Sequence, residues 1–335
     1  MRPRLGGADA AAPRRHGGAG GAEAREVTVT TPRRFDGVYS VLVTPFTAAG
    51  GIDLDGVARV VDHAVDSGVT GVVTLGLASE VGRLTDDERE ALVAAVVAAA
   101  DGRVEVVAGT EHAAGAPAAR RAAHAAGAGA DALMAFPPAG AAEAQLVAYY
   151  AGITEASGLP VIVQDAPAWT QVRLSTDLLA RVGREVPLAR HVKVEAPPTP
   201  PRIAALHAAG LECIGGLGGL YLAEELDRGV TATMPGCLFP GVYVEMLRSH
   251  AAGDSQVVQR AYAELLPLTV SLMSSLDVFV AVHKHVLWRR GLIATPALRG
   301  PAQPPDARQL DWCVGLAERL TDRFLPRSRG TRPLG

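Results

Sequence analysis

The feature that most constrains the fold is a regular alternation of short Val-rich runs with Ala-rich stretches of helical period. Runs of this length are typical of buried strands, and eight of them, spaced by about 25 to 30 residues, predict parallel strands joined by crossover helices. A count of eight favours a closed (β/α)8 TIM barrel over an open doubly wound sheet, and no GxGxxG motif follows the first run. The expected strands are Val38–Val43, Gly71–Leu75, Val104–Ala108, Ala132–Phe136, Val161–Gln164, His191–Val194, Glu212–Gly215 and Val230–Thr233.

The stretches between these runs carry helix signals at their ends. Thr85 and Glu88 form a capping-box pattern, and Ser175 is a second N-cap. We expect helix stops at Gly68, Gly127, Gly183 and Gly210. The expected helices are Leu54–Ser67, Thr85–Ala100, Ala114–Ala126, Ala142–Ser157, Ser175–Val182, Pro200–Ala209, Leu220–Arg228 and Gly241–Ala252.

Composition divides the chain into four parts. Residues 1–32 are rich in Ala, Gly, Arg and Pro, so we expect a disordered extension, with an organelle transit peptide as the alternative. Residues 33–253 are expected to form the barrel. Residues 254–325 are expected to add helices packed on it, and 326–335 a tail. The added helices are expected at about Ser255–Ser274, Leu276–Arg290 and Asp306–Phe324.

Charge, hydropathy and cysteine spacing exclude several classes of protein. The chain is 48% hydrophobic and 20% charged with a formal net charge of −3, which gives no reason to expect nucleic-acid binding. No run of about 18 apolar residues is present to span a membrane. The three cysteines are far apart and lack CxxC spacing, so we expect reduced thiols in a cytoplasmic protein, without a metal or disulfide framework.

Lysine is nearly absent from the chain. Of 32 Lys plus Arg residues only Lys193 and Lys284 are lysines, so positive charge is otherwise supplied by arginine. Arginine cannot act as an amine nucleophile, whereas a lysine can once burial lowers its pKa. Lys193 lies near the carboxyl end of the sixth expected strand, which is the active-site end of a barrel. We therefore expect amine chemistry at Lys193, with a structural ion pair to Glu195 as the alternative, and a surface or interface role for Lys284.

From Phe35 to Ile293 the chain resembles the dihydrodipicolinate synthase / N-acetylneuraminate lyase family of class I Schiff-base aldolases and lyases. Four segments carry the resemblance, each in the family's order. They are Gly37-Val38-Tyr39-Ser40-Val41-Leu42-Val43-Thr44-Pro45-Phe46, Gly76-Leu77-Ala78-Ser79-Glu80 with Leu84-Thr85-Asp86-Asp87-Glu88-Arg89, Val192-Lys193, and Lys284-His285-Val286-Leu287 with Gly291-Leu292.

The resemblance implies a barrel with C-terminal helices, a homo-oligomer (dimer or tetramer), and no metal or organic cofactor. It also implies an imine between Lys193 and the ketone of pyruvate or another 2-oxo acid. Such an imine is an electron sink that lets a carbanion form at C3, so that a C–C bond can be made or broken, or water lost.

Three departures put the family's proton relay in doubt. Gln164 stands where the family has the Tyr of Tyr-Asn-x-Pro, and a carboxamide does not titrate near neutrality. Leu77 and Ala78 replace two threonines that bind the substrate carboxylate. Phe136-Pro137-Pro138 replaces Pro-Tyr-Tyr. We therefore do not expect the substrate pair of dihydrodipicolinate synthase.

Other groups must then move protons. His112 follows the third expected strand and titrates near neutrality, although such a residue more often caps a loop. Glu195 shares a face with Lys193 and is a second candidate base. Glu80 survives from the family motif, with structural and functional interpretations equally open. His191, on the same face, is expected deeper in the barrel.

The same positions predict the substrate contacts. The loop with Ala78, Ser79 and Glu80 retains backbone N–H groups and the Ser79 hydroxyl, and Gln164 can hydrogen-bond a substrate oxygen. Glycines from Gly215 to Gly219 can admit a phosphate or second carboxylate, or form only a tight turn. Thr231 and Thr233 are expected to point into the barrel.

Two main functions are consistent with these residues. The first is a Schiff-base lyase, an aldolase or a dehydratase, acting on pyruvate or a 2-keto-3-deoxy sugar acid through a Lys193 imine. The second is a barrel that binds a 2-oxo acid or sugar acid without turnover, which the lost Tyr and Thr positions favour. A metal-dependent barrel hydrolase is the weakest alternative, because only scattered histidines occur.

Overall fold

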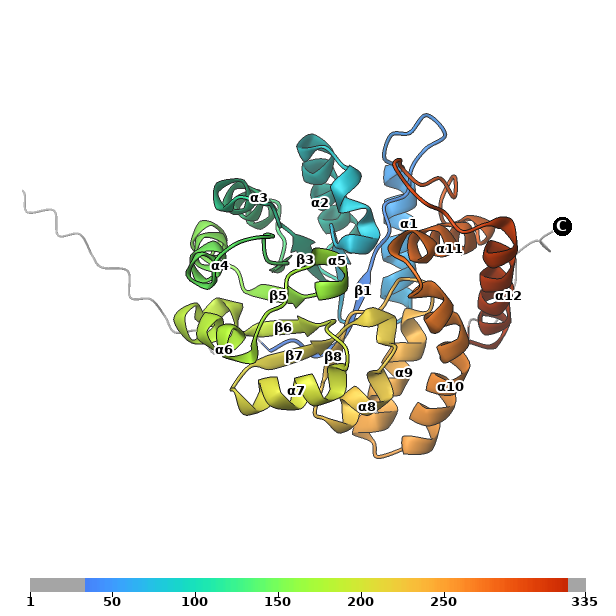
Figure 1. Ribbon diagram of the computed structural model, residues 1–335. Coiled ribbons are helices and arrows are strands. Elements are labelled where there is room, and N and C mark those ends of the chain that lie inside the picture. Colours follow the sequence, from blue (N-terminus) through green and yellow to red (C-terminus); the bar gives the residue numbers. More distant parts are fainter. Residues whose placement is uncertain (1–33, 325–335) are drawn as a thin grey trace, which may run out of the picture. The chain divides into compact units, whose positions relative to one another are not determined.

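A closed barrel of eight parallel strands forms the centre of the computed structural model (Figure 1). The chain divides into residues 1–31 and residues 32–335, and the structure describes residues 34–324, so the expected extension and tail lie outside the described residues. The strands are β1 (Gly37–Val41), β2 (Gly71–Thr74), β3 (Glu105–Gly109), β4 (Ala132–Ala135), β5 (Val161–Asp165), β6 (His191–Val194), β7 (Glu212–Gly215) and β8 (Ala232–Thr233). The order β1 to β8 and the closing β1–β8 pair confirm the predicted TIM barrel.

A ring of helices surrounds the strands (Figure 1). The barrel helices are α1 (Leu54–Asp66), α2 (Asp86–Ala100), α3 (Gly115–Gly127), α4 (Glu143–Ser157), α5 (Pro167–Thr170), α6 (Thr176–Glu185), α7 (Thr199–Ala208), α8 (Leu222–Asp227) and α9 (Pro240–Ala251). Every expected helix is present, and the short α5 was not expected. The Thr85–Glu88 capping box forms as predicted, with the Thr85 hydroxyl accepting from the Glu88 N–H group.

One helix stop was predicted wrongly. Gly183 lies inside α6, which continues to Glu185, rather than beyond its end. Packing explains this glycine, because a Cβ at residue 183 would lie 2.6 Å from Cδ2 of Leu211. Gly68 and Gly210 do end helices and have positive φ angles of 78° and 82°.

Alternation along the strands separates two apolar layers. The layer between strands and helices contains Val192 and Val194 of β6. The interior of the barrel is filled by a second cluster from several strands: Phe35, Tyr39, Val41, Val73, Ala78, Val107, Ala132, Met134, Ile162, Ile214, Ala232 and Met234. The predicted inward face of β6 is therefore confirmed, with His191 buried toward the amino end of the strand and stacked edge-on against Phe35.

The prediction for β8 was wrong by one position. Ala232 and Met234 point into the barrel, so Thr231 and Thr233 cannot share that face. Thr231 precedes the strand at its amino end, where its hydroxyl donates to the Phe35 carbonyl at 3.4 Å. Thr231 therefore lies at the opposite end of the barrel from a site at the carboxyl ends of the strands.

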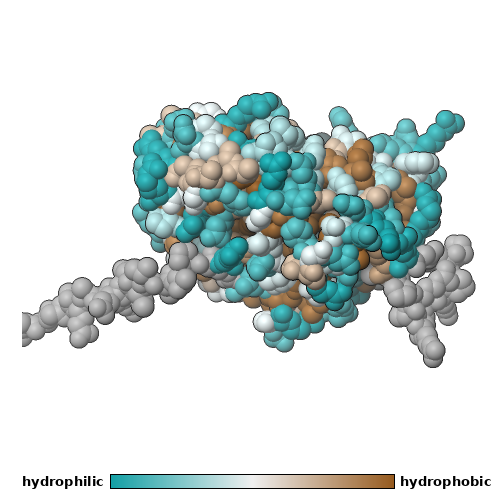
Figure 2. Space-filling model, turned by 90° about the horizontal axis from the view of Figure 1, so that it is seen from below, coloured by the Kyte–Doolittle hydropathy of each residue, from teal (hydrophilic) through white to brown (hydrophobic). Residues whose placement is uncertain are grey.

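Three helices follow the barrel and pack on it: α10 (Ser255–Leu272), α11 (Leu276–Arg289) and α12 (Ala307–Phe324). Their buried residues, such as Leu265, Val282 and Ala317, belong to the same hydrophobic cluster as the barrel helices. Figure 2 shows the face at the lower edge of Figure 1, where hydrophilic residues cover most of the surface and hydrophobic ones form smaller patches. No single helix within residues 34–324 has the length and hydropathy to span a membrane. The helices α10 and α11 have that length and hydropathy only when they are taken together, and they are bent by 118° at the break between them.

Candidate active site

Lys193 lines a cavity of about 50 Å³ at the carboxyl ends of the strands. Its side chain extends inward from β6, between Gln164 of β5 and Ile214 of β7, and only 4% of the residue is exposed. The cavity is large enough for more than one water molecule. It is lined by Val41, Leu77, Ala78, Gln164, Trp169, Lys193, Glu195, Leu217, Gly218, Met234, Gly236, Leu272, Met273, Ser275, Leu276 and Phe279.

Glu195 is the carboxylate partner of Lys193 in this cavity. Its Oε1 lies 3.6 Å from the Lys193 Nζ, and both side chains are buried. The same Oε1 accepts a 3.1 Å hydrogen bond from the Leu217 N–H group, and Oε2 accepts from Gln164 Nε2 at 2.6 Å. Two hydrogen-bond donors therefore fix the carboxylate near the amine, at a distance that one bridging water or a small side-chain movement would close for proton transfer.

Gly216 makes room for this carboxylate. A Cβ at residue 216 would lie 2.3 Å from Cγ of Glu195, so a side chain there would displace it. The glycine loop was predicted as an anion site for substrate. Here the anion that the loop binds is the chain's own Glu195, through the Leu217 N–H group, while the Gly219 N–H group donates to the Gly216 carbonyl.

Gln164 occupies the expected position but contacts Glu195. Its side-chain amide donates to the carboxylate instead of presenting both N–H groups to the cavity. Because Gln164 also lines the cavity, it is placed beside any molecule bound at Lys193.

The loop after β2 contributes backbone and apolar groups. Leu77 and Ala78 line the cavity, whereas Ser79 and Glu80 do not. The Ser79 hydroxyl donates to the Leu42 carbonyl at 2.6 Å, which commits it to the barrel wall and away from substrate. The Ser79 N–H group donates to Gly76, and among the described residues the Ala78 N–H group has no acceptor.

Glu80 is part of a buried ion cluster behind this loop. Its Oε1 accepts from the Lys284 Nζ, and its Oε2 accepts from Arg83 and from the Arg299 N–H group at 2.9 Å. These contacts of Glu80 are the ones that its structural interpretation predicts. Lys284 is 0% exposed, so its predicted placement on the surface was wrong.

Lys284 is enclosed on its remaining sides. Its Nζ also donates to the Ala297 carbonyl at 2.8 Å and lies 4.1 Å from the centre of the Phe46 ring. Burial lowers the pKa of Lys284 to about 8, although Glu80 opposes the shift. No residue of this cluster lines the Lys193 cavity.

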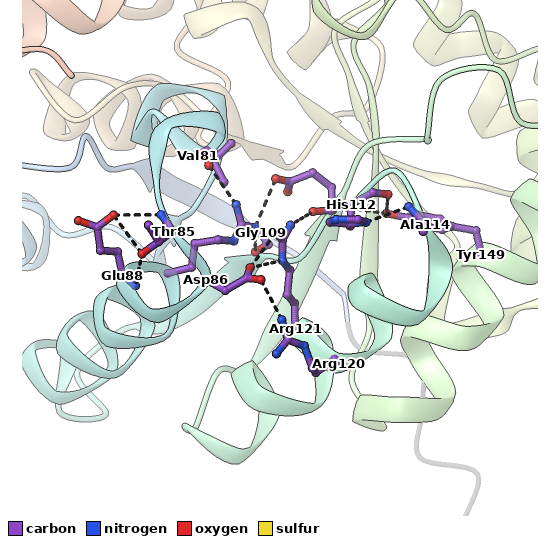
Figure 3. A network of polar contacts seen from close by, with 12 residues as sticks. Val81, Thr85, Asp86, Glu88, Gly109, His112, Ala114, Arg120, Arg121 and Tyr149 are labelled. Carbon is purple, nitrogen blue, oxygen red and sulfur yellow. Dashed lines mark hydrogen bonds and ion pairs between the residues drawn. The ribbon is translucent and has the colours of Figure 1, made fainter. Parts of the chain in front are cut away.

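His112 belongs to a different network of polar contacts, which joins the loop after β3 to Tyr149 of α4 (Figure 3). Its Nδ1 accepts from the Ala114 N–H group at 2.9 Å, and its backbone N–H and carbonyl both pair with the Tyr149 hydroxyl. It does not line the cavity, and its described contacts are those of the loop-capping interpretation. The neighbouring Glu111 is buried against Arg89 at 3.4 Å, and burial raises its pKa.

Sequence reasoning missed one wall of the cavity. Trp169 comes from α5 and the rest from the ends of α10 and α11: Leu272, Met273, Ser275, Leu276 and Phe279. The sequence could have placed Trp169 near the site, because Ala166-Pro167 directly after a strand predicts a turn at the active-site end of the barrel. Nothing in the sequence alone indicated which C-terminal helix would reach the barrel mouth.

Among the described residues, no group of three or more His, Cys, Asp or Glu side chains is arranged to hold a metal ion. Cys213, Cys237 and Cys313 are free and buried.

Comparison with known proteins places the chain in a family. The family model described as "Dihydrodipicolinate synthetase family" matches residues 34–192, a range that ends one residue before Lys193. An L-2-keto-3-deoxyarabonate dehydratase of Azospirillum brasilense is 31% identical over 84% of this chain and 94% of its own length. A 4-hydroxy-tetrahydrodipicolinate synthase 2 of Streptomyces coelicolor is 31% identical over 84% and 95%. The crystal structure of a dihydrodipicolinate synthase from Rhodopseudomonas palustris superposes with a TM-score of 0.79 at 26% identity, over 85% of this chain and 97% of that one.

Proposed function

Because the chain belongs to the dihydrodipicolinate synthetase family and is a lyase of that family, we propose that Lys193 forms the imine through which it acts on a 2-oxo acid. The observation that carries this assignment is the position of Lys193: it is the only lysine among the residues that line the cavity, and a carboxylate lies 3.6 Å from its amine. Relatives of both kinds, a synthase that joins two molecules and a dehydratase, fit chemistry at such an imine.

Glu195 is the acid and base of the proposed reaction. It takes a proton from the Lys193 ammonium, so that the neutral amine can attack the C2 ketone of the substrate. It returns that proton to the hydroxyl that leaves as water when the imine forms. It then removes a proton from C3 to give the enamine. The hydrogen bonds from Gln164 and Leu217 hold the carboxylate in place through these steps.

The substrate carboxylate is proposed to bind at the loop after β2. Ala78 lines the cavity, and its N–H group lacks an acceptor among the described residues. A backbone N–H group can donate to a carboxylate oxygen there without the hydroxyls that Leu77 and Ala78 have replaced. The positive charge of the protonated imine supplies the remaining electrostatic attraction.

Assembly and compartment belong to the same proposal. We propose a homo-oligomer that acts in the cytoplasm, supported by the family relationship and by three free thiols. Light scattering of the purified chain tests the assembly, with a single monomer mass at all concentrations as the contrary result.

Borohydride trapping tests the central step. The protein is incubated with pyruvate, reduced and digested, and the modified peptide is identified by mass spectrometry. We expect the added mass on Lys193, with Lys284 unmodified in the same digest as an internal control. Folded protein that gives no adduct with pyruvate or with longer 2-oxo acids would disprove the assignment.

A barrel that binds a 2-oxo acid without turnover is the second candidate. It is favoured by Gln164, which supplies an amide where a titrating phenol would serve the proton relay. Exchange of the C3 hydrogens of pyruvate in D2O separates the two functions. Trapping with C3 exchange indicates a lyase, and trapping without exchange indicates a binding protein.

A further inference from the structure

The cavity beside Lys193 has few polar side chains. Glu195 and Gln164 lie next to the amine and are hydrogen-bonded to each other. Most of the remaining lining consists of large apolar side chains: Leu217, Met234, Leu272, Met273, Leu276, Phe279 and Trp169. The polar side chain in that region is Ser275, whose hydroxyl serves as the N-cap of α11 by accepting from the Val278 N–H group.

The charged side chains that line the cavity can compensate one anionic group of a substrate but not a second one. Among the described residues that line it, Lys193 is the sole cation and Glu195 the sole anion. A protonated imine at Lys193 would compensate the C1 carboxylate of a 2-oxo acid. A second carboxylate or a phosphate farther along the substrate would meet Glu195 and no arginine, so electrostatic repulsion would oppose it.

A second, smaller cavity of about 20 Å³ adjoins the first. Four residues, Gly218, Gly236, Leu272 and Phe279, line both cavities. The remaining lining is mostly apolar: Leu238, Phe239, Tyr243, Leu265, Leu268, Thr269 and His283. The two spaces therefore share one apolar wall.

Most side-chain polar atoms of the second cavity are already paired within the protein. The Tyr243 hydroxyl donates to the Gly218 carbonyl at 2.9 Å, and the Thr269 hydroxyl donates to the Leu265 carbonyl at 3.1 Å. His283 pairs through Nδ1 with the Phe279 carbonyl at 2.7 Å, and burial lowers its pKa to about 4, which keeps it uncharged at neutral pH. Substrate hydroxyl groups would find few free partners there, and an unpaired buried hydroxyl disfavours binding.

Glycine and aromatic residues shape the wall between the cavities. A Cβ at Gly236 would lie 2.1 Å from Nε2 of His283 and 2.7 Å from Cζ of Phe279. The Phe279 and His283 rings are stacked with centroids 4.0 Å apart. This arrangement fixes the Phe279 ring in the lining of the Lys193 cavity, where it can contact an apolar group of the substrate.

We propose that the group beyond C4 of the substrate is uncharged and apolar, an aryl or alkyl chain, and that Phe279, Leu272 and Trp169 select it. The inference rests on the proposed function, since it concerns the part of the substrate that projects from the Lys193 imine. A polyhydroxylated sugar-acid chain and a chain with a second anion are both disfavoured by this wall.

The reaction on such a substrate balances without any further reagent. A 4-hydroxy-2-oxo acid with an apolar group on C4 forms the imine at C2. Its C3–C4 bond breaks, the electron pair moves to C3 as the enamine, and the C4 hydroxyl proton passes to Glu195. C4 leaves as an apolar aldehyde. C3 takes a proton and hydrolysis of the imine with water releases pyruvate.

The test compares two substrates of the full-length protein. Release of pyruvate is measured with 4-hydroxy-2-oxo-4-phenylbutanoate and with a 2-keto-3-deoxy pentonate whose C4 also carries a hydroxyl. We expect kcat/KM for the phenyl substrate to be higher by about tenfold or more. For the sugar acid, kcat/KM is measured for release of either the aldehyde or water. A value equal to or higher than that of the phenyl substrate would overturn the inference. The proposed function would still stand if borohydride trapping gave an adduct on Lys193. Failure of trapping on Lys193 would overturn both.

Variants locate the selectivity. Phe279→Leu keeps the wall apolar but removes the ring, so KM for the phenyl substrate should rise about fivefold to tenfold with little change in pyruvate trapping. Val270→Ala is the matched control, because Val270 lies on α10 with 55% of its surface exposed and outside both cavities. Equal kinetics of Phe279→Leu and the wild-type protein would contradict the role given to Phe279.

Discussion

The two lysines of this chain share burial and a glutamate partner, yet their surroundings differ in the respect that matters for chemistry. Lys193 borders an open cavity and lies 3.6 Å from Glu195. Lys284 donates from its ammonium to Glu80 and to the Ala297 carbonyl, lies beneath the Phe46 ring, and lines neither of the two described cavities. A rare lysine is therefore a sign of a special environment, and access to substrate decides whether that environment is catalytic.

The largest expected effect separates the two lysines by activity. Lys193→Arg keeps a positive charge beside Glu195 but removes the nucleophile, so we expect turnover to fall by a factor on the order of 10³ to 10⁴ or more. Borohydride trapping should disappear, and circular dichroism should show a folded protein. Residual trapping at Lys284 in this variant would contradict the expectation that Lys193 alone acts as the nucleophile.

The next effect separates them by stability. Lys284→Met leaves the buried Glu80 carboxylate without its main partner, which should lower the free energy of unfolding by about 3 kcal/mol. This value is at the lower end of the range for breaking a buried ion pair, because Arg83 still donates to Glu80. Urea titration measures the loss, and trapping at Lys193 should persist.

A double variant sharpens this result. Glu80→Gln combined with Lys284→Met removes both charges, so it should recover part of the stability lost in the single variant. No recovery would mean that the cost arises from packing of the lysine stem and not from the ion pair.

A smaller effect concerns the position of Glu195. Gly216→Ala would place a Cβ 2.3 Å from Cγ of Glu195 and push the carboxylate from the amine. We expect kcat to fall by about 10²-fold. The imine should still be trapped, because Lys193 itself is not touched. As a control, Gly82→Ala adds a Cβ with no atom within 4 Å and should leave kcat unchanged.

The smallest effect is the pH dependence of the Lys284 cluster. The pKa of Lys284 falls from 10.5 to about 8 in the folded protein, so between these values the unfolded chain binds more protons. The unfavourable contribution of Lys284 is thus complete below pH 8 and is lost as the pH rises toward 10.5. The stability difference between the wild-type protein and Lys284→Met should grow by up to about 1 kcal/mol per pH unit in that range. Urea titrations at several pH values test this, and a constant difference would contradict the shift.

Residue periodicity was enough to predict the barrel, because each strand and helix is specified by a few neighbouring residues. The inward face of β6 followed from the same alternation, since Val192 and Val194 mark the opposite face. The error at Thr231 and Thr233 shows the limit of this reasoning. The alternation of these threonines with Ala232 and Met234 defines two faces of β8, but it does not say which face points into the barrel, and here the apolar one does.

The site depended on contacts between distant parts of the chain. Lys284 and Glu80 are 204 residues apart, and the Phe279 wall reaches a cavity built around β6. No local pattern encodes such pairings, so Lys284 was placed on the surface. His112 was chosen for its chemistry at a strand end, but its ring nitrogen is used to cap its own loop.

The Glu80 cluster also bears on how the protein is synthesised. The loop that carries Ala78 and Glu80 leaves the ribosome long before its partners, and Arg299 follows Glu80 by 219 residues. At usual elongation rates this is a delay of roughly 10 to 40 s, during which the Glu80 carboxylate has neither Lys284 nor the Arg299 N–H group to compensate its burial. The loop after β2 is thus completed by the last tenth or so of the chain, and a nascent barrel that has all eight strands still awaits its active site.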